Sequence, residues 1–225
     1  MKQTLVILTI AFSPDYDISP LLLESLSEAQ LEPVSLLNAL SCEEINEKYA
    51  PRKGEKAQIV RLAEGTEMLL ATSRIERGLQ QLISQLESRG VENILLLGCG
   101  QFTELQARNA ILMEPDRLIP PLVGAIVGGH QAGIIVSANE LLRQQAGKWR
   151  VLRKPACFAV ADPLQSDNQA LFDAGLMLLE QGADVVVLDS PAYHPHHCDS
   201  LQQLLGIPVL LSWQSLAEMV AGVLA

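Results

Sequence analysis

The sequence has few positive charges and no long apolar run. Its 225 residues carry 16 Lys and Arg against 26 Asp and Glu, a formal net charge of −10. Sequence-independent binding to nucleic acid, like a polybasic membrane anchor, needs clustered basic residues. The longest apolar runs, such as 94–97 and 185–188, fall far short of the roughly 20 residues of a membrane helix. We therefore expect a soluble protein that binds neither nucleic acid nor a membrane.

Cysteine is also scarce, and its spacing excludes a paired metal or redox motif. Cys42, Cys99, Cys157 and Cys198 are far apart and form no C-x-x-C pair. The N-terminal segment 1–10 has one Lys and a short apolar stretch with two Thr, which favours a buried first strand over an export signal. Without export we expect a cytoplasmic protein whose cysteines are thiols, because disulfides are rare in that compartment.

What the sequence does contain is typical of a globular α/β protein. Apolar residues make up 48% of the chain and charged residues 19%, a balance that excludes intrinsic disorder. Short aliphatic runs alternate with stretches of helical period, the pattern of parallel strands covered on both faces. The predicted strands are 5–10, 68–71, 93–97, 132–136, 157–160, 185–188 and 209–211.

Three capping-box patterns mark the starts of predicted helices. They begin at Ser41, Ser73 and Ser166, each with Glu or Gln three residues later. The second precedes an apolar stripe that ends at Gly90, which predicts a helix over 73–89. Pro120 and Pro121 predict a turn into a further helix over 122–129.

The chain also has a broad two-part symmetry. Helix 73–89, a strand and Cys99 resemble helix 168–181, a strand and Ser190, so each half delivers a small nucleophilic side chain just after a buried strand. That edge of an open α/β sheet is where ligands bind. We predict two pseudo-symmetric lobes with parallel sheets and an active-site cleft between them. The first lobe comprises 1–105 with 206–225, including the final strand and helix, and the second comprises 106–205.

Several segments spread over essentially the whole chain resemble the AroM family. They are 48–51 (KYAP), 74–79 (RIERGL), 106–123 (QARNAILMEPDRLIPPLV), 130–133 (HQAG) and 182–189 (GADVVVLD). AroM proteins are similar in fold to the aspartate/glutamate/hydantoin racemases, which work without a cofactor. The family name implies a link to aromatic amino-acid biosynthesis and no defined activity.

The resemblance implies a position for the reactive groups. Racemases of this superfamily place one cysteine from each lobe on either side of the substrate's α-carbon. Cys99 corresponds to the first cysteine position, and Ser190 occupies the second. His194, four residues after Ser190, lies near the position of a racemase histidine, and we expect it to be the acid or base of the site. The order Tyr193-His194-Pro195 is the reverse of the racemase order.

A serine in the second position disfavours two-way racemisation, because a hydroxyl needs an adjacent base to lose its proton. One-thiol chemistry remains: the Cys99 thiol protonates an enolate after decarboxylation, or adds to a double bond and permits isomerisation. We therefore predict a cofactor-free isomerase or lyase that acts next to the carboxylate of a small acid, in one version an aromatic one. The expected catalytic residues are Cys99, Ser190 and His194. The expected substrate contacts are Ser13, Gly100, Gln101, Asn139 and Pro191.

Other interpretations of these residues stay open. Ser190 with Pro191 also fits a helix N-cap followed by proline at the first helical position. The cluster from Tyr193 to Cys198 holds three of the four histidines, and a metal-dependent hydrolase is the weakest alternative, because crowded ligands are atypical of zinc sites. We predict no metal. The main rival is a non-catalytic protein that binds a small carboxylate or regulates aromatic metabolism. The sequence is compatible with a homodimer.

Overall fold

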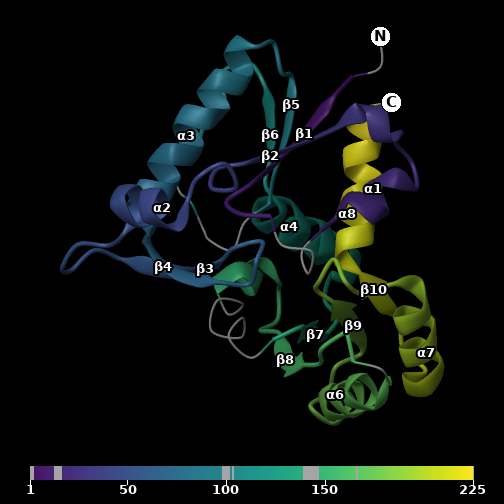
Figure 1. Ribbon diagram of the computed structural model, residues 1–225. Coiled ribbons are helices and arrows are strands. Elements are labelled where there is room, and N and C mark those ends of the chain that lie inside the picture. Colours follow the sequence, from purple (N-terminus) through teal and green to yellow (C-terminus); the bar gives the residue numbers. More distant parts are fainter. Residues whose placement is uncertain are drawn as a thin grey trace. The chain divides into compact units, whose positions relative to one another are not determined.

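The computed structural model describes residues 3–12, 17–97, 102, 104–138, 147–165 and 167–224. The chain forms two compact units. Unit 1 comprises Met1–Pro115 and Ala221–Ala225, and unit 2 comprises Asp116–Val220. Each unit contains a parallel four-stranded sheet with helices packed on it (Figure 1). Among the described residues, no helix combines the length and apolar content needed to cross a membrane.

The sheet of unit 1 has the order β2-β1-β5-β6, with every neighbouring pair parallel. The two central strands are buried along nearly their whole length, which explains their continuous apolar sequences. The four strands are β1 (Leu5–Thr9), β2 (Leu31–Ser35), β5 (Asn93–Leu97) and β6 (Ile111–Met113).

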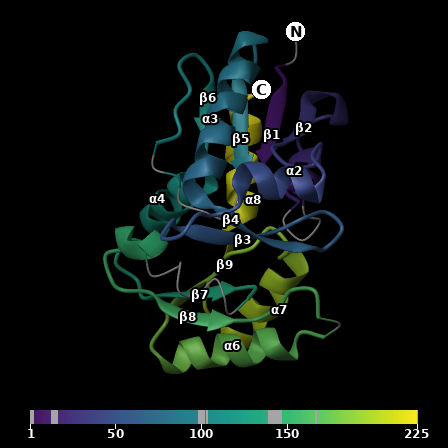
Figure 2. The ribbon, with the colours of Figure 1, turned by 60° about the vertical axis from the view of Figure 1, so that its left-hand side comes forward.

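The long helix α3 (Thr72–Ser88) runs alongside the sheet of unit 1 (Figure 2). It buries one stripe of side chains at helical spacing, Ile75, Leu79, Ile83 and Leu86. The remaining elements of this unit are α1 (Ser19–Leu23), η2 (Glu28–Gln30), α2 (Cys42–Tyr49) and the antiparallel hairpin of β3 (Ala57–Arg61) and β4 (Glu67–Ala71).

A glycine lets α2 and α3 approach closely. A Cβ atom at Gly78 would lie 2.9 Å from the Tyr49 hydroxyl and 3.1 Å from Leu36. Both distances are shorter than side chains tolerate without moving, so the hydrogen at this position makes room for Tyr49. Tyr49 and Gly78 belong to two of the family-like segments, KYAP and RIERGL.

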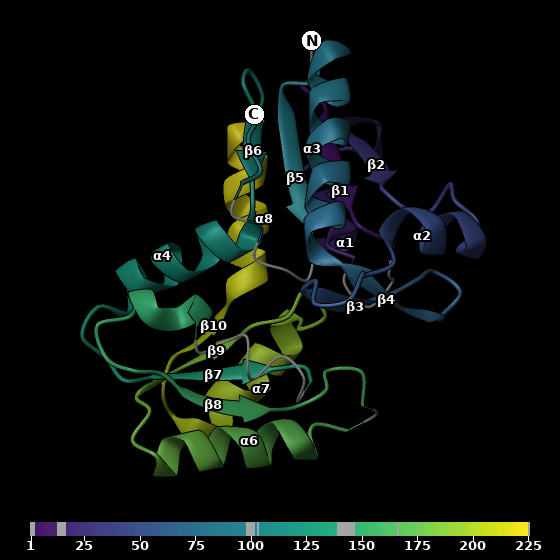
Figure 3. The same cartoon turned by 90° about the vertical axis from the view of Figure 1, so that its left-hand side faces the viewer.

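The sheet of unit 2 has the order β10-β9-β7-β8, again with every pair parallel. Helices α6 and α7 pack on each other, α6 against β7 and β8 and α7 against β10 (Figure 3). The strands are β7 (Ala132–Val136), β8 (Cys157–Val160), β9 (Val185–Leu188) and β10 (Val209–Leu211). The helices are α4 (Pro115–Val127), η3 (Trp149–Val151), α6 (Gln169–Glu180), α7 (Pro195–Leu205) and α8 (Ser212–Val223), which passes the boundary of the unit at Val220.

The two sheets share one topology. Numbered by their order along the chain within each unit, the strands lie in the order 2-1-3-4 in both. β1 therefore corresponds to β7, β2 to β8, β5 to β9 and β6 to β10. This repetition confirms the predicted α/β fold with two pseudo-symmetric parallel lobes.

Some predicted elements differ from the structure. The last strand, β10, pairs with β9, so its hydrogen bonds place it in the sheet of unit 2 and not with the first lobe. Helix α4 starts at Pro115 and continues through Pro120 and Pro121, with Ile119, Pro120 and Val123 buried, so burial outweighs the low helix propensity of proline.

Of the three capping boxes, one is confirmed. The Ser41 side chain accepts the Glu44 N–H at the start of α2. Helix α3 begins at Thr72 after Ala71, without a side-chain cap, so Ser73 already lies inside the helix. Ser166 lies outside the described residues, and α6 begins after Asn168.

Candidate functional site

The strand order locates the ligand-binding edge of each sheet. In the order 2-1-3-4 the connections after the first and third strands run in opposite directions, and ligands bind between the carboxyl ends of those strands. The pair is β1 and β5 in unit 1 and β7 and β9 in unit 2. Thr9 pairs with Leu97 and Ile135 with Leu188, so the two strands of each pair end at nearly the same level.

In unit 1, four of the predicted site residues follow in sequence the strands that end at this edge. Ser13, Cys99, Gly100 and Gln101 lie outside the described residues, so their side chains stay predictions. The structure describes where the chain leaves the sheet: β5 ends at Leu97, directly before Gly98 and Cys99. In sequence, Cys99 therefore comes two residues after the third strand of its sheet.

The described polar groups at this edge come from the end of β2 and the turn after it. The Phe12 N–H donates to Asn38 Oδ1 at 3.1 Å, and the Ser35 hydroxyl donates to Ile10 O at 3.1 Å. Ser35 and Asn38 thus hold the segment that follows β1. The sequence analysis missed both, because β2 contains Glu32 and Pro33 and lacks the apolar run of a buried strand.

In unit 2 the equivalent edge carries Asp189 and Ser190, directly after β9, while Asn139 lies outside the described residues. Ser190 is 4% exposed. Its Oγ accepts the Ala192 N–H at 3.3 Å, and its carbonyl accepts the Tyr193 N–H at 3.3 Å. Ser190 and the buried Pro191 therefore belong to a tight turn.

This turn overturns the interpretation of Ser190 as a helix N-cap. Helix α7 begins at Pro195, so His194 is the N-cap residue and Pro195 is the proline of the first turn. The Tyr193 side chain is buried and its hydroxyl donates to Ala161 O at 2.6 Å. That bond ties the turn to the residue that follows β8.

Unit 2 contains a cluster of charged side chains around the buried Asp189. The Lys148 Nζ atom lies 2.7 Å from Asp189 Oδ2 and 3.4 Å from Asp116 Oδ1. The Ser212 hydroxyl donates to the other oxygen of Asp189 at 2.9 Å. The Lys148 side chain is 8% exposed and that of Asp189 1%. The cluster joins the end of β9 to the first turns of α4 and α8.

The pKa values in this cluster reflect burial and mutual charge. Burial raises the pKa of Asp116, against the opposing effect of the Lys148 charge. For Lys148 burial acts to lower the pKa, but Asp189 and then Asp116 outweigh it and raise the pKa above its usual value. Lys148 is therefore charged at neutral pH. Sequence reasoning missed the cluster because its residues are far apart in the chain.

The histidines lie at the start of α7, beyond the Ser190 turn. The His194 N–H donates to Nδ1 of His197 at 3.0 Å, which closes a capping box. His194 and His196 are exposed, and His197 is buried. Burial, followed by the charges of His196 and His194, lowers the pKa of His197 to about 4. No hydrogen bond joins the described side chains of Ser190 and His194.

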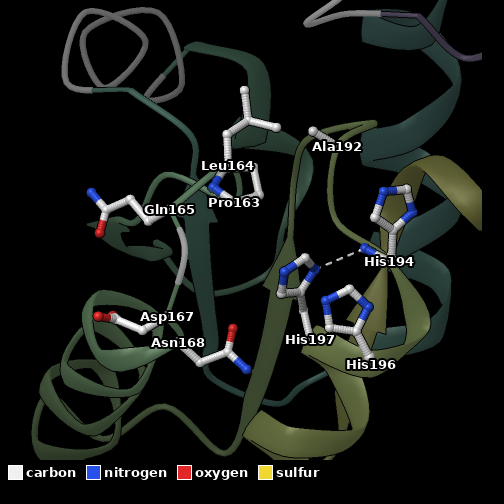
Figure 4. Close-up of a pocket in the computed structure, with 9 residues that line it drawn as sticks. All are labelled: Pro163, Leu164, Gln165, Asp167, Asn168, Ala192, His194, His196 and His197. Carbon is white, nitrogen blue, oxygen red and sulfur yellow. Dashed lines mark hydrogen bonds between the residues drawn. The ribbon is translucent and has the colours of Figure 1, made fainter.

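These histidines form one wall of an open cavity in unit 2. Its volume is about 410 Å³, and its other wall is the segment between β8 and α6 (Figure 4). The cavity is lined by residues 163–165, 167, 168, 192, 194, 196 and 197. It lies beyond the carboxyl ends of β8 and β9, on the side of the sheet where ligands are expected. Sequence analysis found the histidines but not the wall opposite them.

The described cysteines are free thiols. Cys42 is exposed at the start of α2, and Cys157 is half-buried in β8. The Cys198 thiol donates to Val209 O at 3.2 Å, and burial raises its pKa. In the described part of the chain, no group of three or more His, Cys, Asp or Glu side chains is arranged to hold a metal ion.

Comparison with known proteins identifies relatives of this fold. A family model described as AroM protein matches residues 5–224. No curated protein matches the chain.

Among solved structures, the chain is similar to unliganded arylmalonate decarboxylase, at 11% identity and a TM-score of 0.54, covering 98% of this chain and 93% of that one. It is similar to allantoin racemase from Pseudomonas fluorescens, at 11% identity and a TM-score of 0.55, covering 98% and 90%. It is also similar to aspartate racemase from Picrophilus torridus, at 13% identity and a TM-score of 0.50, covering 97% and 94%. At these identities the likeness establishes the aspartate/glutamate racemase-like fold.

Proposed function

Since the chain belongs to the AroM family and has a racemase-like fold, we propose that it is a racemase-superfamily enzyme that acts next to the carboxylate of a small acid. The reaction is an isomerisation or a decarboxylation carried by one thiol, that of Cys99. It requires no cofactor. The racemases and the decarboxylase of similar fold support the reaction class. The family name suggests that this small acid is aromatic.

The observation that carries this proposal is the repeated strand order. β5 and β9 are equivalent strands of the two sheets; β5 ends at Leu97, two positions before Cys99 in the sequence, and β9 ends at Leu188, two positions before Ser190. Both strands border the point where connections change direction, so both residues follow the ligand-binding end of their sheet. Two unrelated loops would not be expected to coincide in this way.

The proposed chemistry follows from the difference between a thiol and a hydroxyl. A free cysteine has a pKa near 8.5, so the thiol and the thiolate are both accessible near neutral pH. In a decarboxylation, the C–C bond to the carboxylate breaks, CO₂ leaves, and the electron pair stays on the substrate as an enolate. The Cys99 thiol then donates its proton to the α-carbon, and the thiolate recovers a proton from water.

In unit 2, we propose that Ser190 and His194 assist this thiol. Ser190 Oγ accepts one backbone N–H, and its own proton makes no hydrogen bond to the described residues. It can therefore donate to a substrate carboxylate, with the Lys148–Asp189 pair holding the end of β9 in place. His194 is the nearest acid or base candidate in the following segment. Ser13, Gly100, Gln101, Asn139 and Pro191 remain the proposed substrate contacts.

The experiment is proton exchange in D₂O. The protein is incubated with phenylmalonate, phenylacetate and 2-phenylpropionate, and NMR follows loss of CO₂ and deuterium at the α-carbon. We expect turnover of at least one acid by the wild type and by Cys157→Ser, the matched control. Cys99→Ser should lose about 10²–10⁴-fold of that rate, the usual contribution of acid–base catalysis.

Iodoacetamide labelling tests the alternative of a non-catalytic carboxylate-binding protein. In the proposed enzyme, Cys99 reacts faster than Cys157 and is protected by the acid that is turned over. Equally slow labelling of both thiols, together with no exchange on any acid, would overturn the proposed reaction and favour the binding protein.

A further inference from the structure

The cavity of unit 2 has the size of a small-molecule site. Its volume of about 410 Å³ lies within the roughly 300–1,000 Å³ typical of ligand pockets. Two separate segments form it: the loop before α6 on one side, and Ala192 with the first turn of α7 on the other (Figure 4). All lining residues belong to unit 2.

One wall presents a ring nitrogen of a largely buried histidine that has no hydrogen-bond partner among the described residues. His197 is 6% exposed, and its Nδ1 accepts the His194 N–H. Nδ1 therefore carries no proton, and the neutral ring must carry it on Nε2. Nε2 makes no hydrogen bond to the described residues, and Figure 4 shows that side of the ring turned to the opposite wall of the cavity. An acceptor on a ligand would satisfy this donor.

The opposite wall presents a second polar group. The Asn168 side chain stands at the N-cap of α6, makes no capping bond, and turns toward the imidazoles (Figure 4). The carboxylate of Asp167 points away and accepts the Gln169 N–H at 3.0 Å. The first turns of α6 and α7 thus meet at the cavity, and their partial positive charge favours an anion.

The cavity also offers apolar contact. Pro163, Leu164 and Ala192 line it, and Leu164 is 64% exposed. The rings of His194 and His197 are stacked with centroids 6.0 Å apart, and those of His196 and His197 lie 3.8 Å apart. Such a lining suits a ligand with a flat or apolar body.

We propose that this cavity binds a small organic acid, with its carboxylate on the His197 Nε2–H and the Asn168 amide and its apolar body against Pro163 and Leu164. The site stands on unit 2 alone. Its two proposed polar contacts, His197 and Asn168, have no part in the proposed Cys99 chemistry, although His194, the acid or base candidate of that chemistry, lines the same cavity. An acid bound here need not be the substrate.

The test is a titration of the full-length protein followed by the ring nitrogen signals of its four histidines at pH 7.5. We expect benzoate to shift the Nε2–H signal of His197 saturably. His130 provides an internal control, because it pairs with Asp184 at 3.0 Å just before the start of β7, at the opposite edge of the sheet. A shift at His130 as large as that at His197 would overturn the site.

Two further ligands define the chemistry. Benzamide has the same ring without the charge, and inorganic phosphate has the charge without the ring. Weaker binding of both supports an organic acid site. Benzamide binding as tight as benzoate would overturn the anion assignment, and phosphate binding as tight would overturn the organic one. Absence of any saturable benzoate shift would overturn the proposal as a whole.

Asn168→Leu removes the amide while keeping the side-chain size. We expect it to weaken benzoate binding about fivefold, equivalent to about 1 kcal/mol, the value of one hydrogen bond. Asn46→Leu, at an exposed position on α2, is the matched control and should bind as the wild type does. An unchanged dissociation constant in Asn168→Leu would contradict the site, and an unchanged histidine spectrum without ligand shows that the variant is folded.

Discussion

The two units repeat one strand order but hold the chain near the ligand-binding edge by different means. In unit 2, the buried pair of Lys148 and Asp189 does so at the end of β9, and Lys148 also pairs with the partly exposed Asp116. In unit 1, half-buried side chains of α3 hold the chain of residues 104–110 through solvent-exposed hydrogen bonds to its backbone.

The contacts in unit 1 form a row along α3. Glu76 Oε1 accepts the Glu104 N–H at 3.0 Å. One turn later, Gln80 pairs with both backbone groups of Gln106, at 2.9 and 2.8 Å. Near the end of the helix, Glu87 accepts three successive backbone N–H groups. Residues 104–110 are thus hydrogen-bonded to α3 at three positions along the helix.

This difference has energetic consequences. Breaking a buried ion pair leaves an uncompensated charge in a poorly solvated place, whereas water replaces a lost partner at an exposed hydrogen bond. Substitutions near the edge of unit 2 should therefore affect stability far more than those near the edge of unit 1. The residues that follow the third strands also differ: Cys99 follows β5 and Ser190 follows β9 in sequence. The predictions that follow test these contrasts in order of expected effect.

The largest effect is expected from removing the chemical difference between the two positions. Ser190→Cys introduces a second thiol after β9. If Cys99 and this residue serve opposite faces of one α-carbon, racemisation of optically pure 2-phenylpropionate should rise about 100-fold. Chiral chromatography measures it. Ser84→Cys, an exposed thiol on α3, is the control. No gain over that control would show that the two positions do not act on one carbon.

The next effect concerns the buried cluster. Lys148→Met should cost about 3–5 kcal/mol of unfolding free energy, because Asp189 stays buried without its counter-charge and the partly exposed Asp116 loses its partner as well. Urea unfolding measures the loss. Lys53→Met, an exposed lysine of unit 1, should change stability by less than about 0.5 kcal/mol.

A second substitution separates charge from packing. Asp189→Asn in the Lys148→Met background removes one uncompensated carboxylate and should recover part of the loss. Hydrogen exchange in β1 and β5 should remain close to that of the wild type. A loss below about 1 kcal/mol in Lys148→Met would show that the cluster does not stabilise the edge of unit 2.

The pH dependence of stability should also divide the units, because all four histidines lie in unit 2. The folded-state pKa of His197 is lowered to about 4, against about 6.5 when unfolded. The unfolded chain therefore binds the proton first, and stability present above pH 6.5 is lost as the pH falls toward 4. At pH 5 the loss is about 2 kcal/mol.

Urea unfolding at pH 7.5 and pH 5 measures this loss. His197→Gln keeps an acceptor for the His194 N–H but has no proton to gain, so its stability should be nearly independent of pH in this range. His130→Gln is the matched control and should retain the dependence on pH. Equal dependence in the wild type and in His197→Gln would show that another group is responsible.

Much of the fold could be predicted from local pattern. The apolar runs at 93–97, 132–136 and 185–188 are strands because both faces of a parallel sheet are covered, and that burial excludes polar residues. β2 was missed because an edge strand tolerates Glu32 and Pro33. The run at 68–71 is a strand, but it belongs to an antiparallel hairpin and not to a parallel sheet. The hairpin was not predicted, because its other strand, β3, has no continuous apolar run.

The candidate site could be predicted only in part. Ser190 and the histidines lie close in sequence, and their segment was found. The Lys148–Asp189–Asp116 cluster was not, because tertiary packing alone brings its members together. Pro191 and Pro195 both fit the first helical turn by sequence, and the structure begins α7 at Pro195, after a turn whose Tyr193 bonds to the distant Ala161. Long-range contacts are what single-sequence reasoning lacks.

The smallest effect should come from Glu87, the half-buried counterpart in unit 1, whose hydrogen bonds water can replace. Its Oε1 accepts the N–H groups of Arg108, Asn109 and Ala110 at 2.7, 2.6 and 3.1 Å. These bonds, first that of Asn109 and then that of Ala110, lower the pKa of Glu87. The carboxylate therefore keeps them until the pH falls below the ordinary range of glutamate, near 4.5.

Glu87→Gln keeps an acceptor oxygen but loses the charge that strengthens all three bonds. We expect several-fold faster hydrogen exchange at Arg108, Asn109 and Ala110, with little change in the urea midpoint. Glu47→Gln, on the exposed side of α2, should alter neither. If Glu87→Gln lowered the urea midpoint as much as Lys148→Met does, the contrast between a water-replaceable edge in unit 1 and a buried charged edge in unit 2 would be wrong. Unchanged exchange at the three amides would show instead that the backbone of 108–110 holds its place without the carboxylate.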